Sequence, residues 1–141
     1  MYDKSKDTIV AELIPAAAYS ASNTPAAVDV AEGKDATILL CVGVGGITFT
    51  AANKIEFVLT HSEDGEAYAN VESRDVIGAG EVTGGIICTL KEAHADSEVK
   101  KYGYVGGKRY IKLLAKFSGT HGTATPLAAA VTQSEPYKRP V

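Results

Sequence analysis

The segment His61-Ser62-Glu63-Asp64 places the residue types of a serine hydrolase at four consecutive positions. A catalytic triad, however, is assembled from separate parts of a chain, with the base held against the nucleophile. Neighbouring residues on an extended strand point to opposite faces and do not meet. We therefore interpret the segment as a strand end that runs into an acidic turn at Asp64-Gly65. We expect the protein not to be an enzyme.

The residue types that could hold a metal ion are spread along the chain. His61, His94 and His121 each lack a second His or Cys at ligand spacing. Cys41 and Cys88 lie in apolar runs and form no CxxC pair. We expect both to be reduced thiols buried in the core, where a free Cys behaves as a small hydrophobe. The sequence predicts no metal, no cofactor and no small-molecule substrate.

Cations and tyrosines cluster in residues 99–134, which hold six Lys or Arg residues and no acid. Aromatic and cationic side chains on a strand can bind single-stranded nucleic acid, but nucleic-acid domains are usually basic and this chain has a net charge of −3. Tyr and Arg are also preferred anchors of protein interfaces. We favour a protein interface, with a solvated strand face as an alternative. The candidate interface residues are Tyr104, Lys108, Arg109, Tyr110, Lys112 and Lys116.

The acids of the chain lie elsewhere, because residues 1–98 carry sixteen acids and only six cations. This division predicts separate acidic and basic surfaces, which favour charged partners, including other copies of the chain. Since no acid interrupts residues 99–134, we expect the repulsion among their cations to be relieved by a partner or by salt. The acidic partner surface would lie on another protein or on residues 56–75 of a second copy.

These residues are carried by short strands separated by Gly-rich turns. In residues 108–117, apolar side chains alternate with cations, which is typical of a strand with one wet face. Residues 54–62 follow nearly the same alternation. Residues 36–44 are apolar at successive positions, which predicts a strand covered on both faces. Further strands are expected at 86–91, 97–105 and 123–132, with one helical turn within 71–77.

About eight strands and almost no helix predict a single all-β domain in residues 27–134. A jelly-roll-like antiparallel sandwich is the favoured fold, and an immunoglobulin-like sandwich is the alternative, although no Cys…Trp…Cys pattern is present. Residues 1–26 contain two prolines and are predicted to be an extended N-terminal arm with a short edge strand at 8–13. Residues 135–141 are predicted to be a C-terminal tail. We expect the arm to serve assembly rather than the fold of the domain.

The strands and turns of residues 27–134 resemble those of a family of phage proteins. The segment KYGYVGGKRYIKLLAKFSGTHGTATPLAAAV is similar to the C-terminal half of small structural proteins of tailed bacteriophages. The segments VGVGGITFTAANKIEFVLTHSEDGEAYANV and RDVIG fit the same pattern, in which a strand ends in a His-Ser-acidic-Asp-Gly turn. The resemblance is strongest to the capsid cement (decoration) proteins of short-tailed phages similar to the Bordetella phage.

This resemblance implies a jelly-roll-like structural protein on the outer surface of an icosahedral virion, made in the cytoplasm of a bacterial host. There it would bridge neighbouring subunits of the major capsid protein, often as a homodimer, and each copy would act multivalently. A phage head–tail joining or tail-tube subunit and a single-stranded nucleic-acid-binding domain are the alternatives. No apolar run approaches the ~18 residues of a membrane-spanning helix, so we expect no membrane partner.

Overall fold

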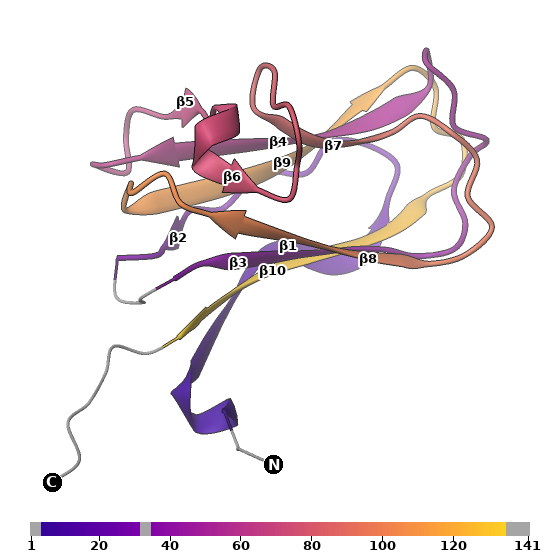
Figure 1. Cartoon of the computed structure of the whole chain (residues 1–141). Coiled ribbons are helices and arrows are strands. Elements are labelled where there is room, and N and C mark those ends of the chain that lie inside the picture. The colour runs from indigo at the N-terminus through magenta and orange to yellow at the C-terminus, as the bar shows by residue number, and fades with distance from the viewer. Residues whose placement is uncertain (1–3, 32–34, 135–141) are drawn as a thin grey trace, which may run out of the picture.

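A computed structural model describes residues 4–31 and 35–134, which form a sandwich of two antiparallel sheets (Figure 1). Sheet A has the strand order β1-β10-β3-β8-β6, and sheet B has the order β2-β9-β4-β5 with β7 also paired to β4. Sheet A consists of β1 (Thr8–Tyr19), β10 (Thr125–Ser134), β3 (Thr37–Val42), β8 (Glu98–Tyr104) and β6 (Val76–Ile77). Sheet B consists of β2 (Val28–Asp29), β9 (Tyr110–Ser118), β4 (Lys54–Ser62), β5 (Ala69–Asn70) and β7 (Ile86–Leu90). Two 3₁₀ turns, η1 (Ser5–Asp7) and η2 (Ser73–Asp75), complete the elements.

The path of the chain is that of a jelly roll. Strands β1 to β4 alternate between sheet A and sheet B, and β8, β9 and β10 alternate again on the way back. The first and the last strands therefore lie side by side, with β1 antiparallel to β10. Two sheets joined by such crossings define the jelly roll. The predicted all-β sandwich is thus confirmed, and the immunoglobulin-like alternative does not describe this strand order.

The core lies between the sheets and is built from every second residue of the long strands. In β9, Ile111, Leu113 and Ala115 face inward and are each 0% exposed, as the alternation of residues 108–117 predicts. Strand β4 covers the same residues as its prediction, 54–62. The helical turn predicted within 71–77 is η2. The largest fully buried apolar side chains are Phe57, Leu13, Ile14, Ile38, Leu40, Ile55, Leu59, Ile111, Leu113 and Val131.

The N-terminal segment belongs to the sandwich, so its prediction as a separate arm is wrong. Its strand extends through twelve residues, Thr8–Tyr19, and not only through 8–13. Leu13 and Ile14 enter the core with 1% and 0% of their surface exposed. Pro15 is tolerated because β1 is an edge strand whose pairing with β10 is irregular on both sides of Ile14. The predicted tail, 135–141, lies outside the described residues.

The chain that follows β1 crosses to sheet B and lines an edge of β9. Strand β2 pairs with β9 over only two residues, so much of that edge needs other partners. The Ala115 amide donates a hydrogen bond to Asn23 Oδ1 at 2.8 Å, and Asn23 Nδ2 donates to the Leu113 carbonyl at 3.4 Å. The Phe117 amide donates to Ser22 Oγ at 3.0 Å. Two polar side chains from the predicted arm thus take the place of a neighbouring strand.

The two cysteines are free but half-buried, so the prediction that both are buried is wrong. Cys88 on β7 packs against the core as a partly buried residue. Cys41 lies on β3 between Leu40 and Val42, which point into the core, and therefore points outward. The apolar pattern of residues 36–44 predicts cover on both faces, yet among the described residues only the inner face is covered.

Candidate interaction surfaces

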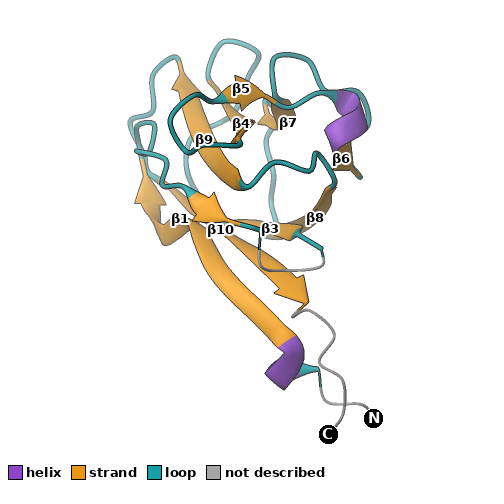
Figure 2. Ribbon diagram, turned by 90° about the vertical axis from the view of Figure 1, so that its left-hand side faces the viewer, coloured by secondary structure: helices purple, strands orange, loops and turns teal. Residues whose placement is uncertain are grey.

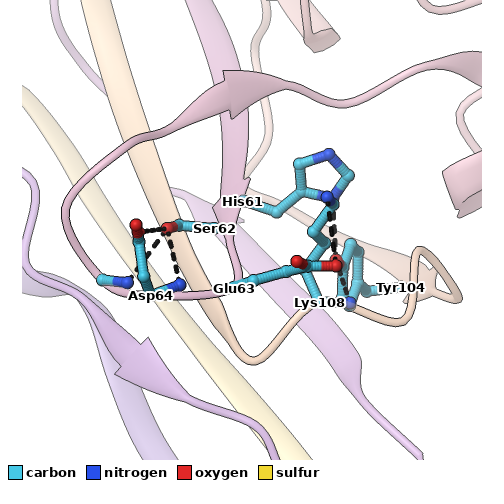
Figure 3. A network of polar contacts seen from close by, with 7 residues as sticks. His61, Ser62, Glu63, Asp64, Tyr104 and Lys108 are labelled. Atoms are coloured by element: carbon cyan, nitrogen blue, oxygen red, sulfur yellow. Dashed lines mark hydrogen bonds and ion pairs between the residues drawn. The ribbon is translucent and has the colours of Figure 1, made fainter.

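Figure 3 shows the end of β4 and the turn that follows it. The His61 Nδ1 atom lies 2.8 Å from the hydroxyl oxygen of Tyr104. The Ser62 hydroxyl donates a hydrogen bond to Asp64 Oδ1 at 2.8 Å. The two neighbours thus use different partners, as the geometry of a strand requires. Because the Ser62 proton is directed at Asp64, His61 is not placed to remove it, and the turn has the geometry of a structural element.

Asp64 is the centre of this turn. Its Oδ1 accepts hydrogen bonds from the amides of Glu66 and Ala67 at 2.9 and 3.0 Å, in addition to the Ser62 hydroxyl. These donors, the backbone amides first, lower the pKa of Asp64 from 3.8 to about 2, because they stabilise the charged carboxylate. Gly65 provides the positive φ of 78° that lets the chain turn beside the carboxylate.

This turn should give the protein a defined sensitivity to acid. A pKa lower in the folded chain than in the unfolded chain stabilises the fold above about pH 4, and this stabilisation is lost as the pH falls towards about 2. We expect Asp64→Asn to flatten the decrease in Tm between about pH 5 and pH 2, measured by circular dichroism. Glu66→Gln removes an acid from the same turn but keeps Asp64, and its pH profile should match that of the unchanged protein. Parallel profiles for Asp64→Asn and the unchanged protein would contradict this prediction.

Tyr104 is buried, so its prediction as an interface residue is wrong. It is 6% exposed because it faces the core from β8, like Tyr102 two positions earlier. Its hydroxyl oxygen contacts His61 and accepts a hydrogen bond from the Lys108 amide at 3.1 Å. Burial raises the pKa of Tyr104 and lowers the pKa of His61. The pair therefore belongs to the interior of the sandwich, at the end where β4 and β8 finish.

The predicted cations at the start of β9 are paired with acids of the same chain. Lys108 Nζ lies 3.4 Å from Glu63 Oε1. Arg109 donates to Asp29 Oδ2 through Nε at 3.1 Å and a terminal nitrogen at 2.9 Å, which lowers the pKa of Asp29. Acids from residues 1–98 thus lie beside these cations. The expectation that only a partner or salt relieves their repulsion is wrong, because the fold brings distant segments together.

The remaining predicted residues lie along the outer face of sheet B. Lys112 Nζ lies 4.1 Å from the centre of the Tyr68 ring, and the Arg109 guanidinium lies 5.1 Å from the centre of the Tyr110 ring. Both distances are within the range of cation–π attraction. Lys116 is exposed at the far end of β9, where it faces Glu56 across the strand pair. This face therefore presents aromatic rings, cations and acids together.

His94 and His121 are distant in the sequence but both contact Phe49, at the end of the sandwich opposite to His61. Phe49 lies between His94 and His121, with ring centres 5.4 and 6.2 Å away. His94 Nε2 donates to the Gly43 carbonyl at 3.0 Å, and His121 Nε2 donates to the Ser118 carbonyl at 2.9 Å. The described residues contain no group of three or more His, Cys, Asp or Glu that could hold a metal ion. These two histidines therefore hold their loops in place through hydrogen bonds to backbone carbonyls.

The outer face of sheet A is a second candidate surface, which the sequence reasoning did not assign. Strand pairing arranges its outward residues in three rows. The rows are Val10–Thr132–Thr37–Gly103–Ile77, Glu12–Ala130–Leu39–Lys101 and Ala128–Cys41–Val99. Val10, Ile77 and Val99 are 65%, 64% and 70% exposed. The apolar run of residues 36–44 was the signal for this face, because Leu39 and Cys41 point outward from β3 and are apolar like the inward residues Ile38, Leu40 and Val42.

No protein-family model, curated protein or solved structure matches this chain. Among the described residues, none of the helices has the length and apolar character needed to cross a membrane.

Proposed function

We propose that this protein is a structural virion protein, a capsid cement protein that binds the outer surface of a bacteriophage head and bridges neighbouring major capsid protein subunits. The resemblance of residues 27–134 to cement proteins of short-tailed phages supports this function. The jelly-roll fold also agrees with it, since capsid proteins commonly use this fold. A clamp of this kind needs rigid surfaces rather than an active site.

The observation that carries the proposal is the pair of aromatic–cation stacks on the outer face of sheet B. Tyr110 with Arg109 and Tyr68 with Lys112 are held in place before any partner arrives. Tyr and Arg are the residue types that dominate binding energy at protein interfaces. Ordering them in advance reduces the entropy that binding would otherwise cost. The neighbouring acids Asp29 and Glu63 can set the register on a charged partner.

The shape of the molecule also suits a bridging role. Figure 2 shows that β1 and β10 run on together beyond the rest of the sandwich, with η1 directly before the start of β1. Strand β10 pairs with β3 as far as Thr132, whereas its pairing with β1 continues to Ser134. A projecting ribbon gives one copy a second point of contact on a neighbouring subunit. Two contacts on one rigid body strengthen attachment multivalently.

The proposal is tested by adding the purified protein to heads that lack it and measuring occupancy by sedimentation. We expect saturable binding, and we expect Lys108→Glu with Lys112→Glu to weaken it about tenfold, because each reversal replaces an attractive contact worth ~0.2–1 kcal/mol with a repulsive one. Lys91→Glu makes the same change at an exposed residue outside β9 and should bind normally. No binding of the unchanged protein, or unchanged occupancy of the double variant, would contradict the proposal.

The same stacks could also hold the bases of a single strand, so nucleic-acid binding is the second candidate. Titration of a labelled single-stranded oligonucleotide at several salt concentrations separates the two functions. Phosphate contacts give a steep dependence of affinity on salt concentration. We expect weak binding for a cement protein. Tight binding that falls steeply with salt would favour the nucleic-acid function, whereas ring formation in solution would favour a head–tail or tail-tube subunit.

A further inference from the structure

The outer face of sheet A is largely apolar in its two central strands, although its first row also holds Thr132, Thr37 and Gly103. An antiparallel sheet that faces water on one side normally presents polar residues there. Here the central strands β10 and β3 present Ala128, Ala130, Leu39 and Cys41 outward. Contiguous apolar patches on an otherwise polar protein mark interaction sites. Among the described residues no other element packs over this face, which leaves it open to a partner.

Among the described strand residues that point outward on this face, two are charged, and their positions bear on which partner fits. Glu12 on β1 and Lys101 on β8 occupy opposite ends of one row, Glu12–Ala130–Leu39–Lys101. Both residues are exposed, and neither forms an ion pair with another described residue. A row that begins with an acid and ends with a base is complementary to itself when it is reversed. A two-fold axis produces this reversal, because the same patch then meets itself.

We propose that a second copy of this chain packs face to face on the outer face of sheet A, about a two-fold axis that runs along the strands between β10 and β3. This axis places β1 over the partner's β8 and β10 over the partner's β3. Glu12 then faces Lys101 of the partner subunit, and Leu39 lies over Ala130 of the partner subunit. Sheets stacked ~10 Å apart bury the central apolar rows from water.

The geometry of stacked sheets permits this pairing. With strands ~4.8 Å apart and sheets crossed by ~30°, Glu12 and its partner lysine are offset by about 4 Å along the strands. The length of a lysine side chain covers this offset. The other face-to-face arrangement has its two-fold axis across the strands, along the row Glu12–Ala130–Leu39–Lys101. That axis places Glu12 over Glu12 of the partner subunit. Like charges at that point disfavour it, so the charges select one axis.

This inference goes beyond the proposed function, because the resemblance implies a dimer without assigning a surface to it. The outer face of sheet B, which carries the aromatic–cation stacks, lies on the far side of each sandwich and stays free in such a dimer (Figure 1). One dimer therefore presents two copies of the proposed capsid-binding face. Failure of capsid binding and failure of dimerisation are separate results, because dimerisation is measured without capsids.

The test is an exchange of the two charges in the full chain, with the dimer dissociation constant measured by sedimentation equilibrium. We expect the unchanged protein to form dimers at micromolar concentration. Glu12→Lys alone and Lys101→Glu alone should each weaken the dimer about tenfold or more, because the two-fold axis creates two repulsive contacts. The double variant should restore the dissociation constant to within about threefold, since the pair is re-formed with reversed signs.

The matched control is the same exchange on the other sheet. Glu56 and Lys116 face each other across β4 and β9 on the outer face of sheet B, and Glu56→Lys with Lys116→Glu should leave the dimer unchanged. Circular dichroism verifies that every variant is folded. A monomeric unchanged protein would overturn the inference. The inference would also be overturned if the single variants did not weaken the dimer, or if the double variant did not recover the dissociation constant of the unchanged protein. A protein that stays monomeric and uses the outer face of sheet A to bind capsids would overturn it as well.

Cys41 supplies a second, independent measurement. It lies on β3 beside the proposed axis, so the two Cys41 sulfur atoms come within ~10 Å of each other across the stacked sheets. In a Cys88→Ser background, a short bismaleimide should convert most of the protein into a covalent dimer. Addition of Glu12→Lys should reduce the cross-linked fraction in proportion to the loss of dimer. Absence of cross-linking in a protein that is dimeric by sedimentation would overturn the proposed face.

Discussion

A chain that lacks residues 1–24 should fail to show a cooperative unfolding transition, because it loses a strand of the sandwich and not a loose arm. The deletion removes β1 and with it two core side chains, Leu13 and Ile14. It also removes Ser22 and Asn23, whose side chains hydrogen-bond along the edge of β9. Strand β10 would become an exposed apolar edge, which is prone to aggregation.

Two further variants separate the strand from the rest of the segment. Deletion of residues 1–7 removes η1 but leaves β1 in place, and we expect its Tm to stay close to that of the full chain. Ile14→Ala keeps the strand but leaves a cavity, and it should lower the free energy of unfolding by about 2–5 kcal/mol. Chemical denaturation monitored by circular dichroism measures both effects. A cooperative transition in the 1–24 deletion at the Tm of the full chain would show that β1 is not needed.

The N-terminal segment shows where local sequence reasoning failed. Prolines and small residues correctly argue against a central strand, since proline cannot donate a ladder hydrogen bond. An edge strand with an irregular register tolerates them, and only the presence of β10 alongside makes that strand stable. The pairing joins residues near the two ends of the chain, and no local pattern encodes it. The alternation in residues 54–62 and 108–117, by contrast, was sufficient to predict β4 and the inward face of β9.

The candidate surfaces were predictable to a similar extent. Alternation placed Lys112 and Lys116 on the outer side of β9, where the structure has them. It did not reveal that Arg109 meets Asp29, because these residues are far apart in the sequence and β2 is only two residues long. The inward position of Tyr104 follows from the alternation along β8, which the cation-rich sequence around it obscured. Local periodicity therefore predicts the faces of strands, whereas charge pairing depends on the topology.

Gly119→Ala should be among the most damaging single substitutions outside the core. Gly119 follows β9 with a φ of 80°, a conformation that costs an alanine ~1–2 kcal/mol. A Cβ atom there would lie 2.6 Å from the Ala52 carbonyl oxygen and would overlap Asn53 Oδ1. That oxygen accepts a hydrogen bond from the Thr120 amide at 2.9 Å. The substitution thus strains the backbone and displaces the contact that fastens the β9–β10 turn to the residues before β4.

We expect Gly119→Ala to lower the free energy of unfolding by about 2–3 kcal/mol, the sum of the backbone strain and one lost hydrogen bond. Two alanine variants make the cause identifiable. Gly122 lies in the same turn with no positive φ and open space around its Cβ position, so Gly122→Ala should change stability by less than ~0.5 kcal/mol. Gly84 has a φ of 63° in open space, so Gly84→Ala reports the strain alone. In denaturant titration, the loss in free energy of unfolding should be largest for Gly119→Ala, smaller for Gly84→Ala and smallest for Gly122→Ala. Equal losses for Gly119→Ala and Gly84→Ala would show that the contact with Asn53 contributes nothing.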